Sequence, residues 1–418
     1  RPEGVPHVEK QNSDLSARPR KGSNSPKRGS PVTKAILVLN SGSSSIKYGL
    51  FKAEPNGDLL MRGVIERIGE GAQVSDAKGT EKLPLPNNAD HIQVLRWLTN
   101  ERLNQLTEVQ IVAAGHRVVH GGHEFDHSTL VDPGVIGKIL ELSPLAPAHQ
   151  PHNLAGIAAL GQIWPDIPQV ACFDTAFHQT QPHLAQIYAL PRALTADGVV
   201  RYGFHGLSYD YISSQLPKHL GAEAAEGRVI VLHLGHGASV CAMKGRKSMA
   251  TSMGFTALDG LVMGKRCGDI DPGVIFYLMR DKGLSLVEAE AVVSNEAGLL
   301  GVSGISSDMR DLQDSDAPEA KEAIDLFVYS AAKQIGSMAA SVEGVDAIVF
   351  TAGIGENAPD IRRRILERCE WLGVELDQEA NSNGGPCLTT PNSPVSGWVI
   401  QTDEERVIAE QTCSHLKT

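Results

Sequence analysis

Three glycine-rich turns are the parts of this sequence best suited to chemistry. They read NSGSSS at residues 40–45, LGHGAS at 234–239 and TAGIGEN at 351–357. A turn of this kind gathers backbone N–H groups and hydroxyls into a concave surface that suits phosphate oxygens. A single example would mean little, because hairpins use glycine for their geometry alone. Three of them beside apolar strands predict a nucleotide-binding cleft.

Two common nucleotide signatures narrow this prediction. The segment GLVMGKR at 260–266 has three residues between its glycines, not four, and Arg after its lysine, so it is not a P-loop. The segment GIGENA at 353–358 follows an apolar strand and fits the start of a dinucleotide fingerprint. Too little sequence follows it to complete a dinucleotide-binding fold, which makes a nicotinamide cofactor the weaker alternative.

Five further side chains in glycine-containing or loop segments could act on a bound phosphate. Taken singly, each is better explained as a structural residue bonded to backbone. Taken together, beside phosphate-type turns, they favour phosphoryl transfer, because that chemistry needs positive groups around the spread charge of the phosphoryl group. These residues are Arg117, His149, Asp174, His205 and Arg266.

The C-terminal segment offers a candidate metal ligand. The run TDEE at 402–405 is typical of a helix start, with Thr402 as N-cap and Glu405 closing a capping box. Capping would occupy those two residues. Glu404 would then be free to reach a metal ion directly or through water.

Short apolar strands and helical segments must position these groups. They alternate from Ala35 onward, which is the pattern of an α/β protein. The segments at 36–45 and 229–239 both run from an apolar strand through a polar residue and glycine into a second strand, and Asn40 and His233 are 233 − 40 = 193 residues apart. This echo predicts two related domains, each opening with a hairpin. Two unrelated hairpins are the alternative.

Composition limits the classes of protein that need consideration. The 418 residues are 41% hydrophobic, which predicts two domains, and the net charge of −11 argues against nucleic-acid or anionic-membrane binding. No apolar run reaches the roughly 18 residues of a membrane helix. The six cysteines form no C-x-x-C pair, which indicates reduced thiols and a cytoplasmic location. Residues 1–34, with eight Lys or Arg against three Asp or Glu, are expected to be a disordered basic tail.

Six motifs identify a known family. ILVLNSGSSSIKYGLF, RYGFHGLSYDYI, HLGHGAS, GFTALDGLVMGKRCGDIDPG, GISSDMRDL and FTAGIGENA follow one another as in the acetate kinases, the acetokinase family, and the resemblance covers residues 35–418. It implies an α/β fold of two duplicated actin-like ATPase (ribonuclease H-like) domains, as in sugar kinases and chaperone ATPases, around a nucleotide cleft. Residues 35–178 plus 403–418 would form domain I, and 179–402 domain II. The family is homodimeric and transfers the γ-phosphate of ATP reversibly to acetate, giving acetyl phosphate and ADP, with Mg²⁺ or, as a substitute, Mn²⁺.

The resemblance also implies roles for individual residues. Asn40 and Glu404 would hold the metal, and Asp174, His205, Arg266 and His149 would be catalytic. The acetate site would consist of Arg117 for the carboxylate and Val119, Ala148 and Ala257 for the methyl group. ATP would contact Ser43, Ser45, Lys47, His233, Leu234, Gly235, His236, Gly237, Asp308, Met309, Arg310, Gly353, Ile354, Gly355, Glu356 and Asn357.

Several positions depart from the family pattern. The family usually has Asn at 236, Thr at 265, His at 209 and Asn at 150, where this chain has His, Lys, Tyr and Gln. His236 titrates near neutrality, so we expect ATP affinity to vary between about pH 6 and 8 more than it would with Asn. Leu and Pro are common at 148 and 257, and the two alanines here predict room for propionate, since each buried methylene is worth about 0.8 kcal/mol. The alternative is that neighbouring side chains close in and specificity stays with acetate.

Three functions remain open at this stage. They are an acetate or other short-chain fatty acid kinase, including a propionate kinase; a sugar or polyol kinase; and a non-catalytic ATP-driven clamp. A carboxylate is already ionised at neutral pH and needs no general base, whereas a sugar kinase would use an aspartate as base, and Asp174 could serve either scheme. The cationic site implied at Arg117 argues against a clamp.

Overall fold

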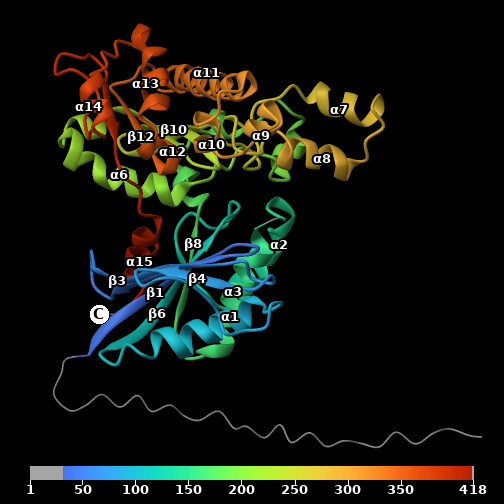
Figure 1. The fold of residues 1–418 in the computed structure, drawn as a ribbon, viewed down its shortest axis with the longest axis vertical. Coiled ribbons are helices and arrows are strands. Elements are labelled where there is room, and N and C mark those ends of the chain that lie inside the picture. Colours follow the sequence, from blue (N-terminus) through green and yellow to red (C-terminus); the bar gives the residue numbers. More distant parts are fainter. Residues whose placement is uncertain (1–31, 148, 417–418) are drawn as a thin grey trace, which may run out of the picture.

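The computed structural model describes residues 32–147 and 149–416. Its elements form two halves, each built on one sheet, stacked one above the other (Figure 1). Most of the expected basic tail lies outside the described residues. The first strand, β1 (Thr33–Ser41), begins two residues before the expected start at Ala35. No helix in the described ranges is long and apolar enough to cross a membrane.

The lower half contains an eight-stranded sheet in the order β5-β4-β3-β2-β1-β6-β8-β7. The strands after β1 are β2 (Ile46–Lys52), β3 (Leu59–Glu66), β4 (Gln73–Asp76), β5 (Gly79–Lys82), β6 (Val109–Val118), β7 (Thr129–Leu130) and β8 (Gln169–Phe173). The helices of this half are α1 (His91–Trp97), α2 (Pro133–Glu141), α3 (Gln150–Ile163) and, from the end of the chain, α15 (Glu404–Ser414).

The central strand of this sheet is buried on both faces. Because side chains alternate along a strand, Leu37 and Leu39 of β1 pack with α1 and α3 on one face. Val38 packs with Ile408 of α15 on the other. The last helix of the chain therefore completes the fold of the first half, next to the β1–β2 hairpin.

The upper half contains a five-stranded sheet in the order β11-β10-β9-β12-β13. Its strands are β9 (Arg228–Leu234), β10 (Ala238–Lys244), β11 (Lys247–Thr251), β12 (Ala347–Thr351) and β13 (Ser396–Val399). Its helices are α4 (His183–Gln186), α5 (Arg192–Ala196), α6 (Gly206–Leu220), α7 (Pro272–Arg280), α8 (Leu286–Asn295), α9 (Gly298–Ser303), α10 (Met309–Gln313), α11 (Pro318–Ser341), α12 (Ala352–Asn357), α13 (Pro359–Glu367) and α14 (Gln378–Ser382).

The two halves share one topology. In the lower sheet β1 pairs antiparallel with β2 and parallel with β6, which pairs parallel with β8. In the upper sheet β9 pairs antiparallel with β10 and parallel with β12, which pairs parallel with β13. The orders β3-β2-β1-β6-β8 and β11-β10-β9-β12-β13 therefore correspond strand for strand. The duplicated α/β fold expected from the sequence echo is confirmed.

Candidate active site

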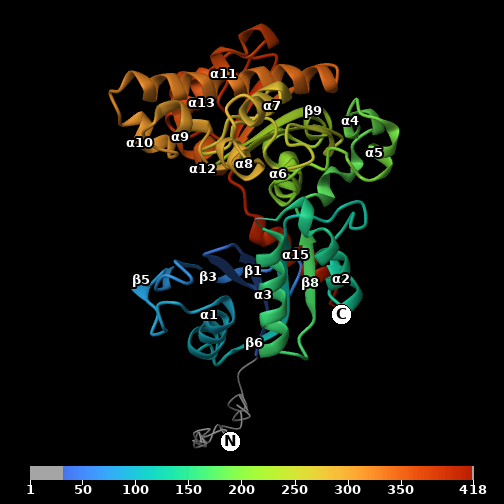
Figure 2. The ribbon, with the colours of Figure 1, turned by 90° about the vertical axis from the view of Figure 1, so that its right-hand side faces the viewer.

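The two hairpins and the start of α15 meet at one cavity. Residues 400–403 carry the chain from the upper half down to α15 (Figure 2). A cavity of about 400 Å³ lies there, and its lining draws on β1, β2, β9, α12 and α15. The expected site residues that line it are Asn40, Lys47, His233, Gly235, Gly353, Glu356 and Glu404.

The first glycine-rich turn is only partly turned toward this cavity. Asn40 and Lys47 lie opposite each other in the β1–β2 register and both line the cavity. The turn between them is closed by the Gly42 N–H, which donates to the Ser45 carbonyl at 2.8 Å. Ser43 is exposed, and neither it nor Ser45 is among the residues that line the cavity.

Asn40 and Glu404 provide donor atoms that suit Mg²⁺. One carboxamide oxygen and one carboxylate on the same cavity are hard oxygen ligands, and Mg²⁺ takes the rest of its shell from phosphates and water. Among the described residues no group of three or more His, Cys, Asp or Glu side chains could hold a metal alone. The chemistry of this donor set therefore fits a cation that arrives with a polyphosphate.

The start of α15 differs from the expected capping box. The cap is Asp403, whose side chain accepts from the Arg406 N–H, and not Thr402. Glu405 is also not a box residue, because its carboxylate accepts from Arg62 of β3 at 2.8 Å. Arg62 also donates to Asp403 at 2.8 Å. The Thr402 hydroxyl instead bonds the Ser208 hydroxyl. Glu404 lies between Asp403 and Glu405, both of which bond Arg62 of the lower sheet.

Arg117 and Asp174 form a buried ion pair at the ends of neighbouring parallel strands. Arg117 Nη2 lies 2.5 Å from Asp174 Oδ2, and Nε lies 3.1 and 3.2 Å from the two carboxylate oxygens. Burial raises the pKa of Asp174, while Arg117 acts in the opposite direction. The carboxylates of Asp174 and Glu404 outweigh burial and raise the pKa of Arg117. Arg117 thus keeps its charge and stays partly exposed.

His205 stands at the head of α6 in a left-handed conformation, with φ at +58°. The next residue, Gly206, donates its N–H to the Asp174 carbonyl at 2.9 Å, and a Cβ there would lie 1.9 Å from that oxygen. Only glycine permits this approach. Residues in rare backbone conformations cluster at functional sites, and here the backbone that follows His205 is held against the Asp174 carbonyl.

Four of the expected catalytic and ATP-binding residues gather around His205. Its ring stacks on that of His233 with 4.1 Å between centroids. A Cβ added to Gly237 would lie 3.3 Å from Arg266 Nη2 and 3.4 Å from His205 Nε2. Burial lowers the pKa of His149, at the start of α3, and the nearby charges of Arg117 and Arg266 lower it further. The structure therefore brings both arginines and the histidines to one place.

The two stacked histidines are neutral. Burial, then the charge of Arg117, lowers the pKa of His233 to about 4. Burial, then His233, Arg117 and Arg266, place the pKa of His205 well below its ordinary value. Each Nδ1 lies 2.8 Å from a serine hydroxyl, Ser239 for His205 and Ser208 for His233. Both imidazoles are therefore hydrogen-bonding groups and not fixed charges.

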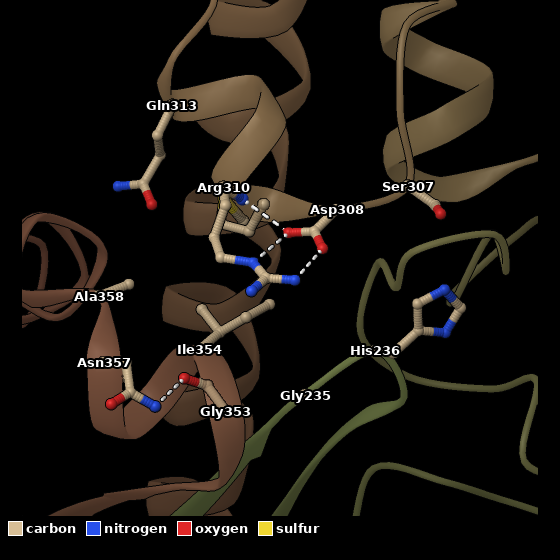
Figure 3. Close-up of a pocket in the computed structure, with 11 residues that line it drawn as sticks. Gly235, His236, Ser307, Asp308, Arg310, Gln313, Gly353, Ile354, Asn357 and Ala358 are labelled. Carbon is tan, nitrogen blue, oxygen red and sulfur yellow. Dashed lines mark hydrogen bonds and ion pairs between the residues drawn. The ribbon is translucent and has the colours of Figure 1, made fainter. Parts of the chain in front are cut away.

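A second cavity, of about 460 Å³, is lined by the side chains drawn in Figure 3. The two share Gly235 and Gly353. Asp308 caps α10 and pairs with Arg310 at 2.6 Å, which lowers the pKa of Asp308 to about 2. The residues that line this cavity are Gly235, His236, Ser307, Asp308, Met309, Arg310, Gln313, Gly353, Ile354, Asn357 and Ala358.

Two expected ATP-binding residues, Leu234 and Glu356, have side chains that contact other parts of the protein. Leu234 is fully buried in the core of the upper half, so only its backbone is available to a ligand. Residues 352–357 form the short helix α12 and not a turn. Glu356 Oε1 accepts from the N–H groups of Ala352, at 2.8 Å, and Thr402, at 3.0 Å. The Glu356 carboxylate therefore joins α12 to the segment that leads into α15.

The residues that depart from the family pattern differ in how deeply they are buried. Gln150 is buried, and its side chain pairs with the backbone of His120. Lys265 is exposed. His236 faces the second cavity, and burial followed by Arg266 and Lys265 lowers its pKa below 6.5. Burial and the two cations move the titration of His236 toward the acidic side of the expected range of pH 6–8, and the pH dependence itself stays a prediction.

The expected acyl pocket is found in part. Val119, nearly buried, belongs to the same apolar cluster as Phe204, and Ala257 packs against that cluster. Arg266 Nη1 donates to the Ala257 carbonyl at 2.6 Å, which ties this wall to the cationic site. Ala148 lies outside the described residues. Sequence reasoning missed Phe204, although it precedes His205, and missed Ser208 and Ser239, which no spacing marks because they lie on different elements.

Comparison with known proteins gives matches along nearly the whole chain. A sequence model of the Acetokinase family matches residues 35–410. An acetate kinase of Rhodopseudomonas palustris is 50% identical over 387 residues, which are 90% of this chain and 97% of that protein. A propionate kinase structure from Francisella tularensis gives a TM-score of 0.86 at 39% identity, covering 92% of this chain and 100% of that one. An acetate kinase structure from Porphyromonas gingivalis gives 0.83 at 38% identity, with the same coverage.

Proposed function

The chain belongs to the acetokinase family, and on this basis we propose that it transfers the γ-phosphate of ATP reversibly to acetate, giving acetyl phosphate and ADP. The observation that carries the proposal is the convergence of Arg117, Arg266 and His205 beside two adjoining cavities. A site that joins two anions needs fixed cations and aligned donors more than it needs a base. These residues supply both.

The reaction forms one P–O bond and breaks another. A carboxylate oxygen of acetate attacks the γ-phosphorus, and the β–γ bridging oxygen leaves with its electron pair on ADP. Arg117 would hold the attacking carboxylate through its partly exposed guanidinium. Arg266 and His205 would donate to the equatorial oxygens of the phosphoryl group, because both face the space beside Gly237. Asp174 fixes Arg117 and needs to accept no proton.

The nucleotide and metal would occupy the two joined cavities. The second cavity has apolar side chains, Ile354 and Met309, for the base, and Gly235 and Gly353 lie at the junction where the phosphates would pass. Asn40 and Glu404 would hold Mg²⁺, or Mn²⁺ in its place. A cation held there would supply positive charge that offsets the negative charge of the phosphate groups.

Propionate is the second candidate substrate. Ala257 is small and packs against the apolar cluster to which Val119 belongs, and a propionate kinase is among the structures that this chain resembles. One methylene usually changes kcat/KM by only about 10–200-fold. We expect kcat/KM for propionate to stay within about 10²-fold of that for acetate.

A hydroxamate assay for acyl phosphate tests the proposed function. The purified protein would be given Mg·ATP with acetate, propionate, butyrate or glycerol. Acyl hydroxamate with acetate, and ADP formation that depends on it, are expected. ADP formation with glycerol but no hydroxamate with any acid would indicate a polyol kinase. ATP hydrolysis indifferent to every acceptor would indicate a clamp, and either result would contradict the proposal.

Three further properties are proposed by analogy with the family: two domains, a homodimeric state and a cytoplasmic location. Residues 35–178 with 403–418, and 179–402, are proposed as two domains that close on the nucleotide. A homodimer is supported by the exposed apolar side chains of α7 and α8, among them Phe276, Leu286 and Val287, on helices that project from the upper half (Figure 1). Light scattering coupled to size exclusion would give the mass. Free cysteines fit a reducing, cytoplasmic location.

A further inference from the structure

The buried hydroxyl of Tyr209 lies behind the proposed catalytic histidine. Tyr209, on α6, is fully buried, and its hydroxyl lies 2.5 Å from Ser239 Oγ. The same Ser239 Oγ lies 2.8 Å from His205 Nδ1. Tyr209, Ser239 and His205 therefore form one line of hydrogen bonds that ends at an imidazole. The other ring nitrogen, His205 Nε2, faces Gly237 and Arg266.

The direction of this line decides which nitrogen of His205 carries hydrogen. His205 is neutral, so it has a single N–H. The Ser239 hydroxyl also has a single hydrogen, so it donates to one neighbour and accepts from the other. Either Tyr209 donates to Ser239 and Ser239 to Nδ1, which leaves hydrogen on Nε2, or every bond is reversed and Nε2 is bare.

Burial of the phenol favours the first direction. In the reversed line the Tyr209 hydrogen would need another acceptor, but its surroundings include the rings of Phe177, His178 and His233. Within the described residues its hydrogen-bonded oxygen or nitrogen acceptor is Ser239 Oγ. A buried donor left without an acceptor is costly. The first direction gives the buried phenol and the Ser239 hydroxyl each an acceptor, and it leaves the Nε2–H facing the proposed site.

We propose that Tyr209 is a positioning residue that, through Ser239, holds His205 as the Nε2–H tautomer, so that this imidazole presents a donor to the phosphoryl group. The role of that donor rests on the proposed function. The tautomer itself does not, because it is set by groups behind the ring. A phosphoryl oxygen accepts hydrogen bonds, so the bare-Nε2 tautomer would face it with a lone pair.

Nitrogen NMR of ¹⁵N-histidine-labelled protein measures the tautomer directly. The chain has 15 histidines, and the His205 signals would be assigned as those missing from His205→Asn. In the wild type we expect one His205 tautomer, with the hydrogen on Nε2. In Tyr209→Phe, where Ser239 can donate or accept, we expect both tautomers. A wild-type His205 protonated on Nδ1, or a single unchanged tautomer in Tyr209→Phe, would overturn the proposal.

Kinetics add a second readout with a matched control. Tyr209→Phe is expected to lower kcat about ten-fold while KM for ATP and acetate stays unchanged. Ser239→Ala should have at least the same effect, and adding Tyr209→Phe to it should cost nothing more, because both act through one line. The control is Tyr202→Phe, which also removes the hydroxyl of a largely buried tyrosine, but one bonded to the Gly198 carbonyl.

The outcomes separate the two proposals. Equal losses of kcat in Tyr202→Phe and Tyr209→Phe, or additive effects of Tyr209→Phe and Ser239→Ala, would overturn the role of Tyr209. If Tyr209→Phe does not fold, Ser239→Ala alone must show the mixed tautomers. If the wild type makes no acyl phosphate but His205 shows the expected tautomer and responds to Tyr209→Phe, the proposed function fails and the control by Tyr209 stands.

Discussion

The β1–β2 and β9–β10 hairpins occupy equivalent places in the two sheets but carry different chemistry. Around the first, charges are held in pairs: Arg117 with Asp174, and Arg62 with Asp403 and Glu405. Around the second, the imidazoles of His205 and His233 are buried, neutral and bonded to serines. Arg266, within the described part of the chain, bonds a backbone carbonyl and no carboxylate.

The difference shows how one duplicated backbone divides a task. The lower half compensates its charges locally, which suits the place where a carboxylate and a cation arrive. At this site the upper half keeps hydrogen-bond donors and Arg266, which has no carboxylate partner among the described residues, and this suits a phosphoryl group that brings its own negative charge. The topology supplies the position, and the side chains around the two hairpins supply different electrostatics.

Removing each arginine should give the largest effects. Arg117→Ala and Arg266→Ala are each expected to lower kcat/KM for acetate by on the order of 10²–10³. Only Arg117→Ala should also lower stability, by about 3–5 kcal/mol, because it leaves the Asp174 carboxylate buried without its partner. Steady-state kinetics and urea unfolding measure the two effects. Arg246→Ala, at an exposed pair with Glu226, is the control. Equal destabilisation by Arg117→Ala and Arg266→Ala would contradict the difference between the two halves.

The next-largest effect is expected at the two adjacent glutamates of α15, whose substitutions should change the Mg²⁺ requirement to different extents. Glu404→Gln is expected to raise the Mg²⁺ concentration needed for half-maximal rate about 10–100-fold, because it weakens a proposed ligand. Glu405→Gln should do less, since the Glu405 carboxylate pairs with Arg62 at 2.8 Å. Titration of activity with Mg²⁺ at fixed ATP measures both. A larger effect from Glu405→Gln would indicate that the metal binds at Asp403 and Glu405, the partners of Arg62, and not at Glu404.

Filling the acyl wall should change specificity more modestly. Ala257→Leu is expected to lower kcat/KM for propionate relative to acetate about ten-fold, because the added side chain takes the space of the extra methylene. Ala250→Leu, in the same apolar cluster but in the upper sheet, is the matched control for crowding. A ratio that Ala257→Leu leaves unchanged would show that Ala257 does not line the acyl pocket.

His236 should give the smallest effect. Its pKa lies below 6.5, so it is neutral at pH 7 and gains charge as the pH falls through that lowered pKa. Protonated His236 would attract phosphate, so KM for ATP should fall toward acidic pH in the wild type relative to His236→Asn. A relative change of about three-fold is expected, as for a solvent-accessible pair. Identical profiles between pH 5 and 8 would remove His236 from the phosphate site.

Much of the fold could be read from the sequence because local patterns determined it. The echo between residues 36–45 and 229–239 predicted the duplication, and the motifs predicted the family, both of which are confirmed. The predicted N-cap of α15, Thr402, was wrong because Asp403 and Thr402 are both good cap residues. Arg62, 341 residues away from Asp403, also bonds the start of the helix, and no local pattern shows this. The partners of His205 and His233 stayed hidden because Ser239 and Ser208 meet them only through tertiary packing.

One carboxylate links regions that the sequence keeps apart. Glu356 accepts from the N–H groups of both Ala352 and Thr402, so α12 and the segment before Glu404 share a single anchor. A ligand that moves α12 would act through Glu356 on the segment that precedes Glu404. Because the coupling free energy between two sites is reciprocal, any effect of nucleotide on cation affinity through this anchor would be matched by an equal effect of the cation on nucleotide affinity.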